Sequence, residues 1–326
     1  MHSHPWDEWI PGVLNKSQVL QLCDLGYITG VETPSEAVDL SSIDLSLSDQ
    51  AFEMKDGSVK PGPSDYDHLL RNRKLAKKLD SESDGSFLLK SKATYVFKLH
   101  ERLSRLGGSS IYGQATAKSS IGRVDVLARL IVDGMDTYES FEPERLKDAS
   151  GNMYLEITPI TFQVRVKRGV RLTQLRLFYG KPRDVQITSN ELFRTVLQGP
   201  GAADGSLTVH LQNEERGGLP VAAFCAKSEA SMDEAIPLYT GKDGKSDPCK
   251  YWRFWESSDN RLRIEKEQFY ILRSKEKIAV PPGIAIYCRA SDETIGEMRI
   301  HYAGFVHPIL ACSEKTARKG RRSSSR

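Results

Sequence analysis

Long apolar runs are missing from this chain: nowhere do roughly 18 apolar residues follow one another, the length that a membrane-spanning helix requires. The N-terminus lacks the basic region followed by an apolar region that marks a secretory signal. Cysteines are few, odd in number and scattered, which argues against a disulfide framework and for a reducing compartment. They are Cys23, Cys225, Cys249, Cys288 and Cys312. We therefore expect a cytoplasmic protein without a membrane partner.

Spacings typical of a protein-bound zinc ion are absent as well. No C-x-x-C pair occurs, and the seven histidines form neither an H-x-E nor an H-x-x-x-H pattern. Zinc sites in deaminases and structural domains are built from such clustered Cys and His ligands. The sequence therefore predicts no zinc and no metal ion held by the protein's own side chains.

A net positive charge is missing outside the last residues, although the formal net charge of the chain is +3 at pH 7. Residues 313–326 contain one acidic residue, Glu314, and the basic residues Lys315, Arg318, Lys319, Arg321, Arg322 and Arg326. The rest of the chain is slightly acidic. Because nucleic-acid binding needs clustered positive charge, we expect no nucleic-acid partner for the folded body.

Helical spacing is rare too. It is found in residues 17–25, where Gly26 would stop the helix, in residues 64–79 and in residues 191–197. Elsewhere short segments alternate apolar and polar residues, as in residues 43–48 and residues 162–167. Many short strands separated by Gly and Pro predict an all-β fold, a barrel or jelly-roll-like sandwich with a few short helices.

An internal comparison indicates two copies of one unit. Residues 95–118 align with residues 270–293 without a gap. The matched pairs are Tyr95 with Tyr270, Glu101 with Glu276, Gly108 with Gly283, Ile111 with Ile286, Tyr112 with Tyr287 and Ala115 with Ala290. One residue's slip later, Ile121-Gly122 meets Ile295-Gly296. Such ordered matches indicate a duplicated β domain.

A Gly- and Ala-rich segment, residues 199–205, separates the two copies and reads as a linker. We therefore predict a first domain over residues 1–198 and a second, degenerate domain over residues 206–312. Residues 313–326 have no strand pattern, and we expect them to form a disordered basic tail. The abrupt loss of pattern suggests a frameshifted or truncated gene, so the second domain is expected to lack strands.

The two copies differ where an anion would be bound. The first reads Lys118-Ser119-Ser120-Ile121-Gly122-Arg123, whereas the second reads Glu293-Thr294-Ile295-Gly296-Glu297. Cations and hydroxyls within one short segment suit phosphate, because each can donate to an anionic oxygen. The alternative without a binding role is an ordinary polar turn after a strand over residues 110–116. If one copy works on an anion, it is the first.

Glu156 is the candidate general base. Met153, Leu155 and Ile157 face one side of a strand, so Glu156 points to the opposite side. A partly desolvated carboxylate there could accept a proton, although a solvated strand residue is equally compatible with the pattern.

Other polar residues admit two interpretations. Gln174 follows a turn at Gly169 and could read polar ligand atoms. Asp125, Asp133 and Asp136 could activate a water molecule or bind a metal ion, or could be ordinary loop carboxylates.

Taken together, the segments resemble the dCTP deaminase branch of the dUTPase-like (β-clip) superfamily, and most closely its two-domain bacterial members. The resemblance spans roughly residues 10–308. The matching segments are Ser41-Ser42-Ile43-Asp44-Leu45-Ser46-Leu47, Lys118-Ser119-Ser120-Ile121-Gly122-Arg123, Tyr154-Leu155-Glu156-Ile157, Arg171-Leu172-Thr173-Gln174-Leu175-Arg176-Leu177, Phe269-Tyr270-Ile271-Leu272 and His301-Tyr302-Ala303-Gly304-Phe305. The S-S-x-x-R element with a Glu on a following strand is the most specific part.

The resemblance implies a zinc-free hydrolysis of dCTP to dUTP and ammonia in pyrimidine deoxynucleotide (dUTP/dTTP) synthesis. It assigns the role of general base to Glu156, while Ser119 and Arg123 hold the attacking water and offset charge. It places Lys118, Ser119 and Ser120 on the triphosphate, often across a subunit boundary of a homotrimer, and Gln174 near the phosphates. Mg²⁺ would enter bound to the triphosphate.

Two alternatives remain open at this point. One is a dUTPase or a bifunctional enzyme releasing dUMP, in which Asp133 or Asp136 would position the hydrolytic water. The other is a nucleotide-binding trimer without activity.

The chain also departs from the family pattern. Residues 128–134 (Ala-Arg-Leu-Ile-Val-Asp-Gly) lack the proline of the usual Ala-x-Arg-Ile-Asp-Pro-Gly turn. In the second copy, His307 stands where Asp is expected. Cytosine specificity is therefore predicted less firmly than nucleotide binding.

Overall fold

The computed structural model describes residues 4–147, 149–184, 189–229, 234–239, 246–281, 286–288 and 305–306. The chain divides into two compact units. Unit 1 contains Met1–Gln186 and Ser228–Asp247, and unit 2 contains Ile187–Lys227 and Pro248–Arg326.

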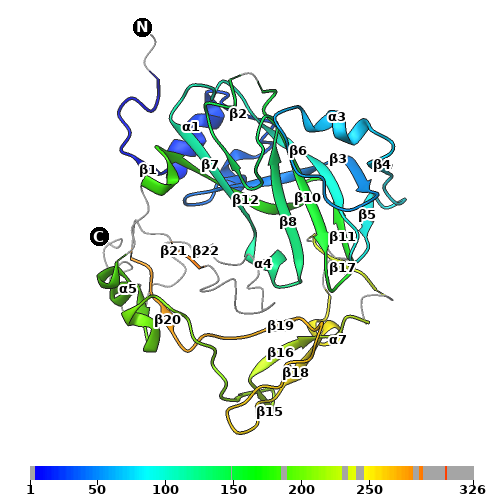
Figure 1. Cartoon of the computed structure of the whole chain (residues 1–326), viewed down its shortest axis with the longest axis vertical. Helices are drawn as coiled ribbons and strands as arrows, with labels where there is room; N and C mark the ends of the chain where they lie inside the picture. Colours follow the sequence, from blue (N-terminus) through cyan, green and yellow to red (C-terminus); the bar gives the residue numbers. More distant parts are fainter. Residues whose placement is uncertain are drawn as a thin grey trace, which may run out of the picture. The chain divides into compact units, whose positions relative to one another are not determined.

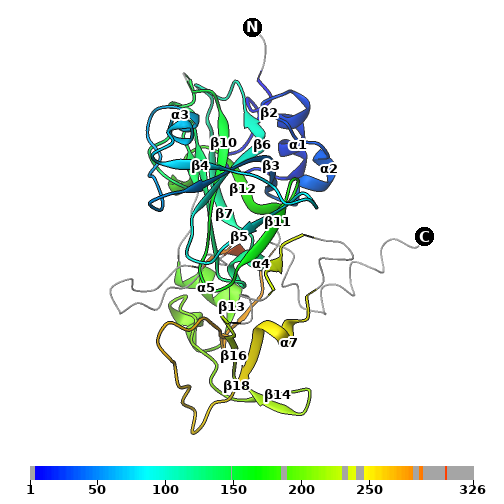
Figure 2. The ribbon, with the colours of Figure 1, turned by 90° about the vertical axis from the view of Figure 1, so that its right-hand side faces the viewer.

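Unit 1 is built around one strongly curved sheet (Figures 1 and 2). The strands follow in the order β8 (Val126–Val132), β10 (Asn152–Pro159), β6 (Tyr95–Leu103), β3 (Ile43–Met54), β12 (Arg171–Tyr179), β7 (Ile111–Ala117) and β9 (Ser140–Phe141). β1 (Gly12–Val13), β2 (Ile28–Thr29) and β4 (Ala76–Leu79) extend this sheet at β12, β6 and β3. All described pairings within it are antiparallel, as the alternating pattern of the sequence predicts.

Glu139 joins the two ends of this sheet. Its backbone N–H donates to the carbonyl of Leu130 on β8 at 2.9 Å, and its carbonyl accepts from Ala115 N on β7 at 2.7 Å. Its side-chain Oε1 also accepts from Leu130 N at 3.2 Å. The left-handed backbone (φ +67°) lets one residue make all three bonds, so the barrel is nearly closed there.

A smaller sheet completes unit 1. β11 (Val164–Lys167) lies between β5 (Ser86–Leu89) and β17 (Ile236–Pro237). Phe87 of β5 packs edge-on against Phe97 of β6, with ring centroids 5.3 Å apart. This contact links the small sheet to the fully buried core of the barrel.

Short helices flank the strands of unit 1. α1 (Lys16–Asp24) begins at Asn15, whose side chain accepts from Gln18 N while Gln18 Oε1 accepts from Asn15 N, and Gly26 follows its end at φ +73°. α1 and α2 (Pro34–Ala37) lie on one side of the unit and α3 (Tyr66–Arg71) on another (Figures 1 and 2).

The helix predicted over residues 64–79 is wrong in its second half. Only α3 is helical there, and residues 76–79 form strand β4 instead. β4 hydrogen-bonds to β3, with Ala76 in register with Met54. Pairing with an open strand edge has therefore overridden the local helical pattern.

Unit 2 contains shorter strands. They are β13 (Leu197–Gln198) with β20 (Lys277–Ile278), β14 (Glu214–Arg216) with β15 (Leu219–Val221), β16 (Ala223–Ala226) between β18 (Trp252–Trp255) and β19 (Tyr270–Ile271), and β21 (Ile286–Tyr287) with β22 (Phe305–Val306). Its helices α5 (Asn190–Val196) and α7 (Pro248–Tyr251) are short, and α5 confirms the helix predicted over residues 191–197.

The two copies of the internal repeat share one buried interaction. In unit 1, Glu101 Oε2 accepts from Ser46 N at 2.8 Å and its Oε1 accepts from Ser46 Oγ at 2.6 Å. In unit 2, Glu276 Oε2 accepts from Thr208 N at 2.7 Å and its Oε1 from Thr208 Oγ1 at 2.8 Å. Glu101 and Glu276 are aligned in the repeat, so the duplicated sequence has kept the same contact in both units.

The predicted all-β fold with a few short helices is confirmed. The predicted boundaries at residues 198 and 205, with residues 199–205 as a linker, stay predictions. The basic tail and the proposed loss of strands near the C-terminus fall on residues 307–326, outside the described part of the chain. In that described part, no helix has the length and apolarity to cross a membrane.

Candidate active site

Glu156 lies in the middle of β10, flanked by β8 and β6. It is in register with Arg129 of β8 and Val96 of β6. Its side chain is 1 % exposed and shares a strand face with Tyr154 and Thr158, as the alternation of the sequence predicts. A carboxylate this deeply buried requires a charged or hydrogen-bonding partner for each oxygen.

Three side chains supply these partners, and we call them with Glu156 the Glu156 cluster. Arg129 donates from Nε to Glu156 Oε1 at 3.0 Å and from a second guanidinium nitrogen to the same oxygen. Ser58 Oγ also donates to Oε1, at 3.1 Å. Tyr138 OH donates to Oε2 at 3.1 Å. Both carboxylate oxygens are therefore satisfied, and the negative charge has a guanidinium beside it.

The three partners of Glu156 act as hydrogen-bond donors at ordinary pH. Burial, followed by the charge of Glu156, raises the pKa of Tyr138 to about 12, so its hydroxyl stays a neutral donor. Arg129 is permanently charged, and Ser58 is neutral at ordinary pH. A carboxylate held by such donors in a low-dielectric setting suits general acid–base chemistry.

Sequence reasoning found Glu156 but missed Arg129, Tyr138 and Ser58. Arg129 carries a weak signal, because it alternates with the apolar residues Ala128 and Leu130 and so faces the same side of the sheet as Glu156. Its cross-strand position depends on the register of β8 against β10, which no single sequence pattern supplies. Tyr138 and Ser58 lie on loops, and no pattern places them.

The predicted phosphate segment forms one helical turn. Lys118 leads into α4 (Ser119–Gly122), which connects β7 to β8 (Figure 1). Lys118 forms an ion pair with Asp44 of β3. Ser119, Ser120 and Arg123 are exposed, so their side chains are accessible to a ligand.

Gln174 lies close to this segment. On β12 it is in register with Asp44 of β3 and with Thr116 of β7. Its Nε2 lies 3.5 Å from Thr116 Oγ1, and the residue is 8 % exposed. The fold therefore brings Gln174 and Lys118 together around Asp44.

Glu156 lies apart from these residues within one chain. Arg123 comes just before β8, whose first residue, Val126, is in register with Pro159 at the end of β10. Glu156 is opposite Arg129, about 10 Å along the strands from that pair. Among the described contacts, no hydrogen bond or ion pair joins Glu156 to Ser119, Ser120 or Arg123.

The aspartates considered for a hydrolytic water are held by other groups. Asp133 accepts from Tyr66 N at 2.7 Å and from Asn152 Nδ2 at 3.1 Å, and burial raises its pKa. Asp136 pairs with Arg145 at 2.6 Å, which lowers the pKa of Asp136. In this structure both carboxylates bind neighbouring protein groups and so hold their loops in place.

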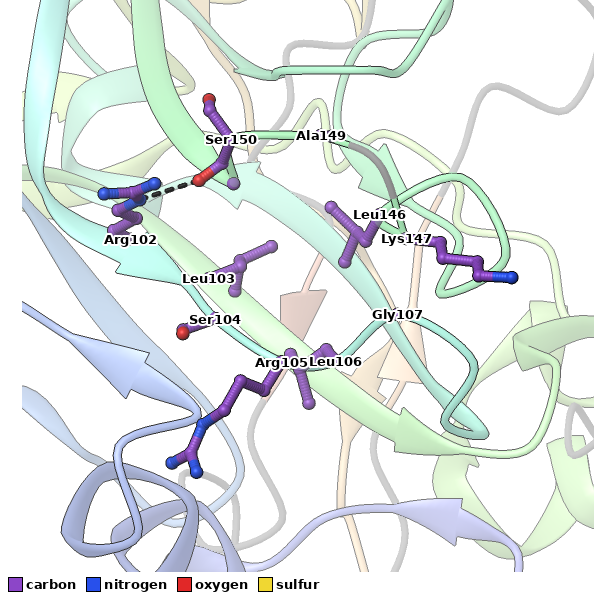
Figure 3. A pocket seen from close by; sticks show the side chains of 11 residues that line it. Arg102, Leu103, Ser104, Arg105, Leu106, Gly107, Leu146, Lys147, Ala149 and Ser150 are labelled. Atoms are coloured by element: carbon purple, nitrogen blue, oxygen red, sulfur yellow. Dashed lines mark hydrogen bonds between the residues drawn. The ribbon is translucent and has the colours of Figure 1, made fainter.

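A hollow of about 320 Å³ lies elsewhere in unit 1, between residues 102–107 and residues 146–151 (Figure 3). Arg102 donates to the carbonyl of Ser150 at 2.7 Å, and Arg105 stacks over Tyr27 at 5.0 Å. In Figure 3 the side chains of Arg105 and Lys147 point away from each other. None of the predicted site residues lines this hollow.

Among the described residues, no group of three His, Cys, Asp or Glu side chains is placed to hold a metal ion. The zinc-free mechanism and the entry of Mg²⁺ with the nucleotide stay predictions.

Comparison with known proteins identifies the family. The model of the 2'-deoxycytidine 5'-triphosphate deaminase N-terminal domain matches residues 10–181, and the model of the C-terminal domain of the same family matches residues 187–323. The crystal structure of 2'-deoxycytidine 5'-triphosphate deaminase from Agrobacterium tumefaciens superposes with a TM-score of 0.76 at 25 % sequence identity, covering 91 % of this chain and 84 % of that chain. A search of curated proteins found no match. The chain belongs to the 2'-deoxycytidine 5'-triphosphate deaminase family.

Proposed function

We propose that this chain hydrolyses dCTP to dUTP and ammonia, with Glu156 as the general base. The observation that carries this assignment is the buried Glu156 cluster, found in a chain whose two halves match the two domains of the dCTP deaminase family. The product dUTP would serve pyrimidine deoxynucleotide synthesis in the cytoplasm.

The proposed reaction needs one water molecule. Glu156 takes a proton from it, and the water oxygen forms a bond to C4 of cytosine. Glu156 passes that proton to ring nitrogen N3, and the proton of the new C4 hydroxyl passes to the exocyclic nitrogen. The bond between C4 and the exocyclic nitrogen then breaks, and ammonia leaves as C4 becomes the carbonyl of uracil. Ser119 and Arg123 would hold the water and offset the charge that develops on the ring.

The triphosphate would be bound by Lys118, Ser119 and Ser120, with Gln174 nearby. Exposure of the two serines and the position of Gln174 beside Asp44 and Thr116 support this assignment. An incoming triphosphate would replace Asp44 as the anionic partner of Lys118. Mg²⁺ would arrive on the phosphate oxygens, which it prefers to an all-protein cage.

A homotrimer whose site combines residues of two copies would explain the separation within one chain. Glu156 and Arg123 lie toward different points of the β8–β10 pair. If Arg123 serves the Glu156 of a neighbouring copy, Glu156→Gln and Arg123→Ala proteins are each inactive alone. Mixing equal amounts after subunit exchange should restore about a quarter of the sites. A mixture as inactive as its components would contradict the shared site.

Product analysis tests the function itself. Purified protein is incubated with dCTP and Mg²⁺, nucleotides are separated by chromatography, and ammonia is assayed in the same samples. Equal amounts of dUTP and ammonia are expected, unchanged by a zinc chelator. Accumulation of dUMP would favour the bifunctional enzyme, and nucleotide binding without turnover would favour a binding protein.

A further inference from the structure

Tyr138 contacts both members of the Arg129–Glu156 ion pair. Its hydroxyl donates to Glu156 Oε2 at 3.1 Å, with the carbonyl of Val59 as a second, more distant acceptor at 3.3 Å. The Arg129 guanidinium carbon lies 4.0 Å from the Tyr138 ring centroid. Arg129 donates to the other oxygen, Oε1. The anion is thus held by the hydroxyl and the cation by the ring face, which fixes the position of each relative to the other.

The backbone next to Tyr138 is fastened to the strand that carries Arg129. Glu139, in the left-handed conformation, exchanges bonds with both backbone groups of Leu130. Because Leu130 directly follows Arg129, this clamp keeps the Tyr138 ring beside the guanidinium. The ring also packs against the core cluster that includes Met54, Tyr66 and Tyr154. Tyr138 is therefore supported on its backbone and on its ring.

Among the described residues, three charged or titratable groups face Glu156. They are Arg129 from β8, Tyr138 from the loop before β9 and Tyr66 from α3, whose pKa burial and Glu156 raise. β6 places Val96 opposite Glu156, and Lys98, paired with Asp67, lies opposite Tyr154. Apart from Arg129, the ionised form of Glu156 is thus stabilised by two neutral donors, Tyr138 at Oε2 and Ser58 at Oε1.

We propose that Tyr138 is a positioning residue for the deamination: with Ser58 as its counterpart, it keeps Glu156 ionised and oriented for proton transfer. This role rests on the proposed function of Glu156 as general base. Removing a donor from a buried carboxylate favours the protonated, inactive form, so the effect must depend on pH.

Tyr138→Phe tests the proposal, because it removes the hydroxyl and keeps the ring over Arg129. The acid limb of the kcat–pH profile for dCTP should move upward by about one pH unit, the size of one hydrogen bond to a charged group. At pH values on that limb, kcat should fall roughly tenfold, while KM changes less than about twofold. Ser58→Ala should move the acid limb in the same direction.

Tyr95→Phe is the matched control. The buried Tyr95 hydroxyl accepts from Lys90 N at 3.0 Å and has no hydrogen bond with Glu156 among the described contacts. This variant should melt at a lower temperature but keep the wild-type acid limb. A purely structural role for Tyr138 would make Tyr138→Phe behave in the same way as Tyr95→Phe.

Three results would contradict the proposal, and they can be told apart. If the wild type is active and folded Tyr138→Phe has the same acid limb, the role of Tyr138 is contradicted and the proposed function is not. Wild-type protein that releases no ammonia from dCTP removes the proposed function and this role with it. Should Tyr138→Phe not fold, an unmoved acid limb in Ser58→Ala contradicts the stabilisation of Glu156 by neutral donors.

Discussion

Units 1 and 2 carry the same buried carboxylate contact but differ in the residues around it. Glu101 with Ser46 and Glu276 with Thr208 use the same atoms, oxygen for oxygen. Leu45-Ser46-Leu47 and Leu207-Thr208-Val209 therefore extend the internal repeat beyond the aligned residues. Duplication has preserved a contact that stabilises the fold, because in each copy the carboxylate accepts from one backbone N–H and one side-chain hydroxyl.

The carboxylates nevertheless differ in their environment. Burial raises the pKa of Glu101 despite its bonds from Ser46. At Glu276 burial also acts to raise the pKa, but the bonds from Thr208 and Gly201 outweigh it, so the pKa is lowered. Both glutamates are almost fully buried, so the difference lies in their donors: Glu276 accepts an additional bond from the backbone of Gly201.

The chemistry-bearing residues differ more than the fold does. Lys118 of the first copy aligns with Glu293 of the second, which lies outside the described residues. Described members of the Glu156 cluster all belong to unit 1. This difference supports the proposal that the first copy works on the nucleotide.

Glu101→Ala and Glu276→Ala give the largest expected change. Each leaves buried donors without an acceptor, and Glu101→Ala should lower the free energy of unfolding by about 3 kcal/mol. Glu276→Ala should also destabilise the chain, because Glu276 is almost as completely buried as Glu101. Denaturant unfolding of the full chain measures both. Wild-type stability in either variant would contradict a stabilising role for that contact.

Lys118→Glu turns the residue of the first copy into that of the second. Charge reversal beside the triphosphate should raise KM for dCTP roughly 100-fold, with a smaller effect on kcat. Steady-state kinetics measures this, and Lys90→Glu, at an exposed position in the same unit, serves as the control. An unchanged KM for Lys118→Glu would mean that this difference between the copies does not concern phosphate.

Glu139 and Glu276 should respond to pH with opposite sign. Burial raises the pKa of Glu139 from 4.5 to about 8, and its Oε2 is buried without a hydrogen-bond partner. Between these values the folded chain holds a proton that the unfolded chain releases. Stability therefore falls as pH rises, by up to about 1.4 kcal/mol per pH unit. The lowered pKa of Glu276 instead gives stability that is lost as pH falls through it.

Glu139→Gln keeps the acceptor for Leu130 N and removes the titration. The melting temperature of Glu139→Gln minus that of the wild type should increase as pH rises from about 5 to about 9. Glu276→Gln, the matched variant of unit 2, should melt at a lower temperature than the wild type throughout the neutral range. This difference should narrow only as pH falls toward the lowered pKa of Glu276. Parallel melting curves for wild type and Glu139→Gln at every pH would contradict the buried proton.

The sequence predicted those features that depend on local alternation. The strand of Glu156 has apolar residues on one face, so the side to which Glu156 points followed directly. The apolar spacing of residues 17–25 and the glycine at position 26 likewise marked α1. The pairing of these strands, however, is a property of the whole barrel.

Long-range contacts account for what was missed. Arg129 reaches Glu156 through the register of β8, and Tyr138 through the left-handed Glu139. Residues 76–79 became strand β4 because β3 offered an edge, although their own spacing favours a helix. None of these outcomes is encoded within a window of a few residues.

Ammonia release from dCTP by Glu156→Gln, beside Glu276→Gln, tests the central claim most directly. Both changes replace a buried glutamate by its amide, one in each unit, and activity is measured per folded protein. The account predicts a loss of at least about 1,000-fold for Glu156→Gln and near wild-type kcat for Glu276→Gln. Substantial turnover by folded Glu156→Gln would contradict the assignment of the general base.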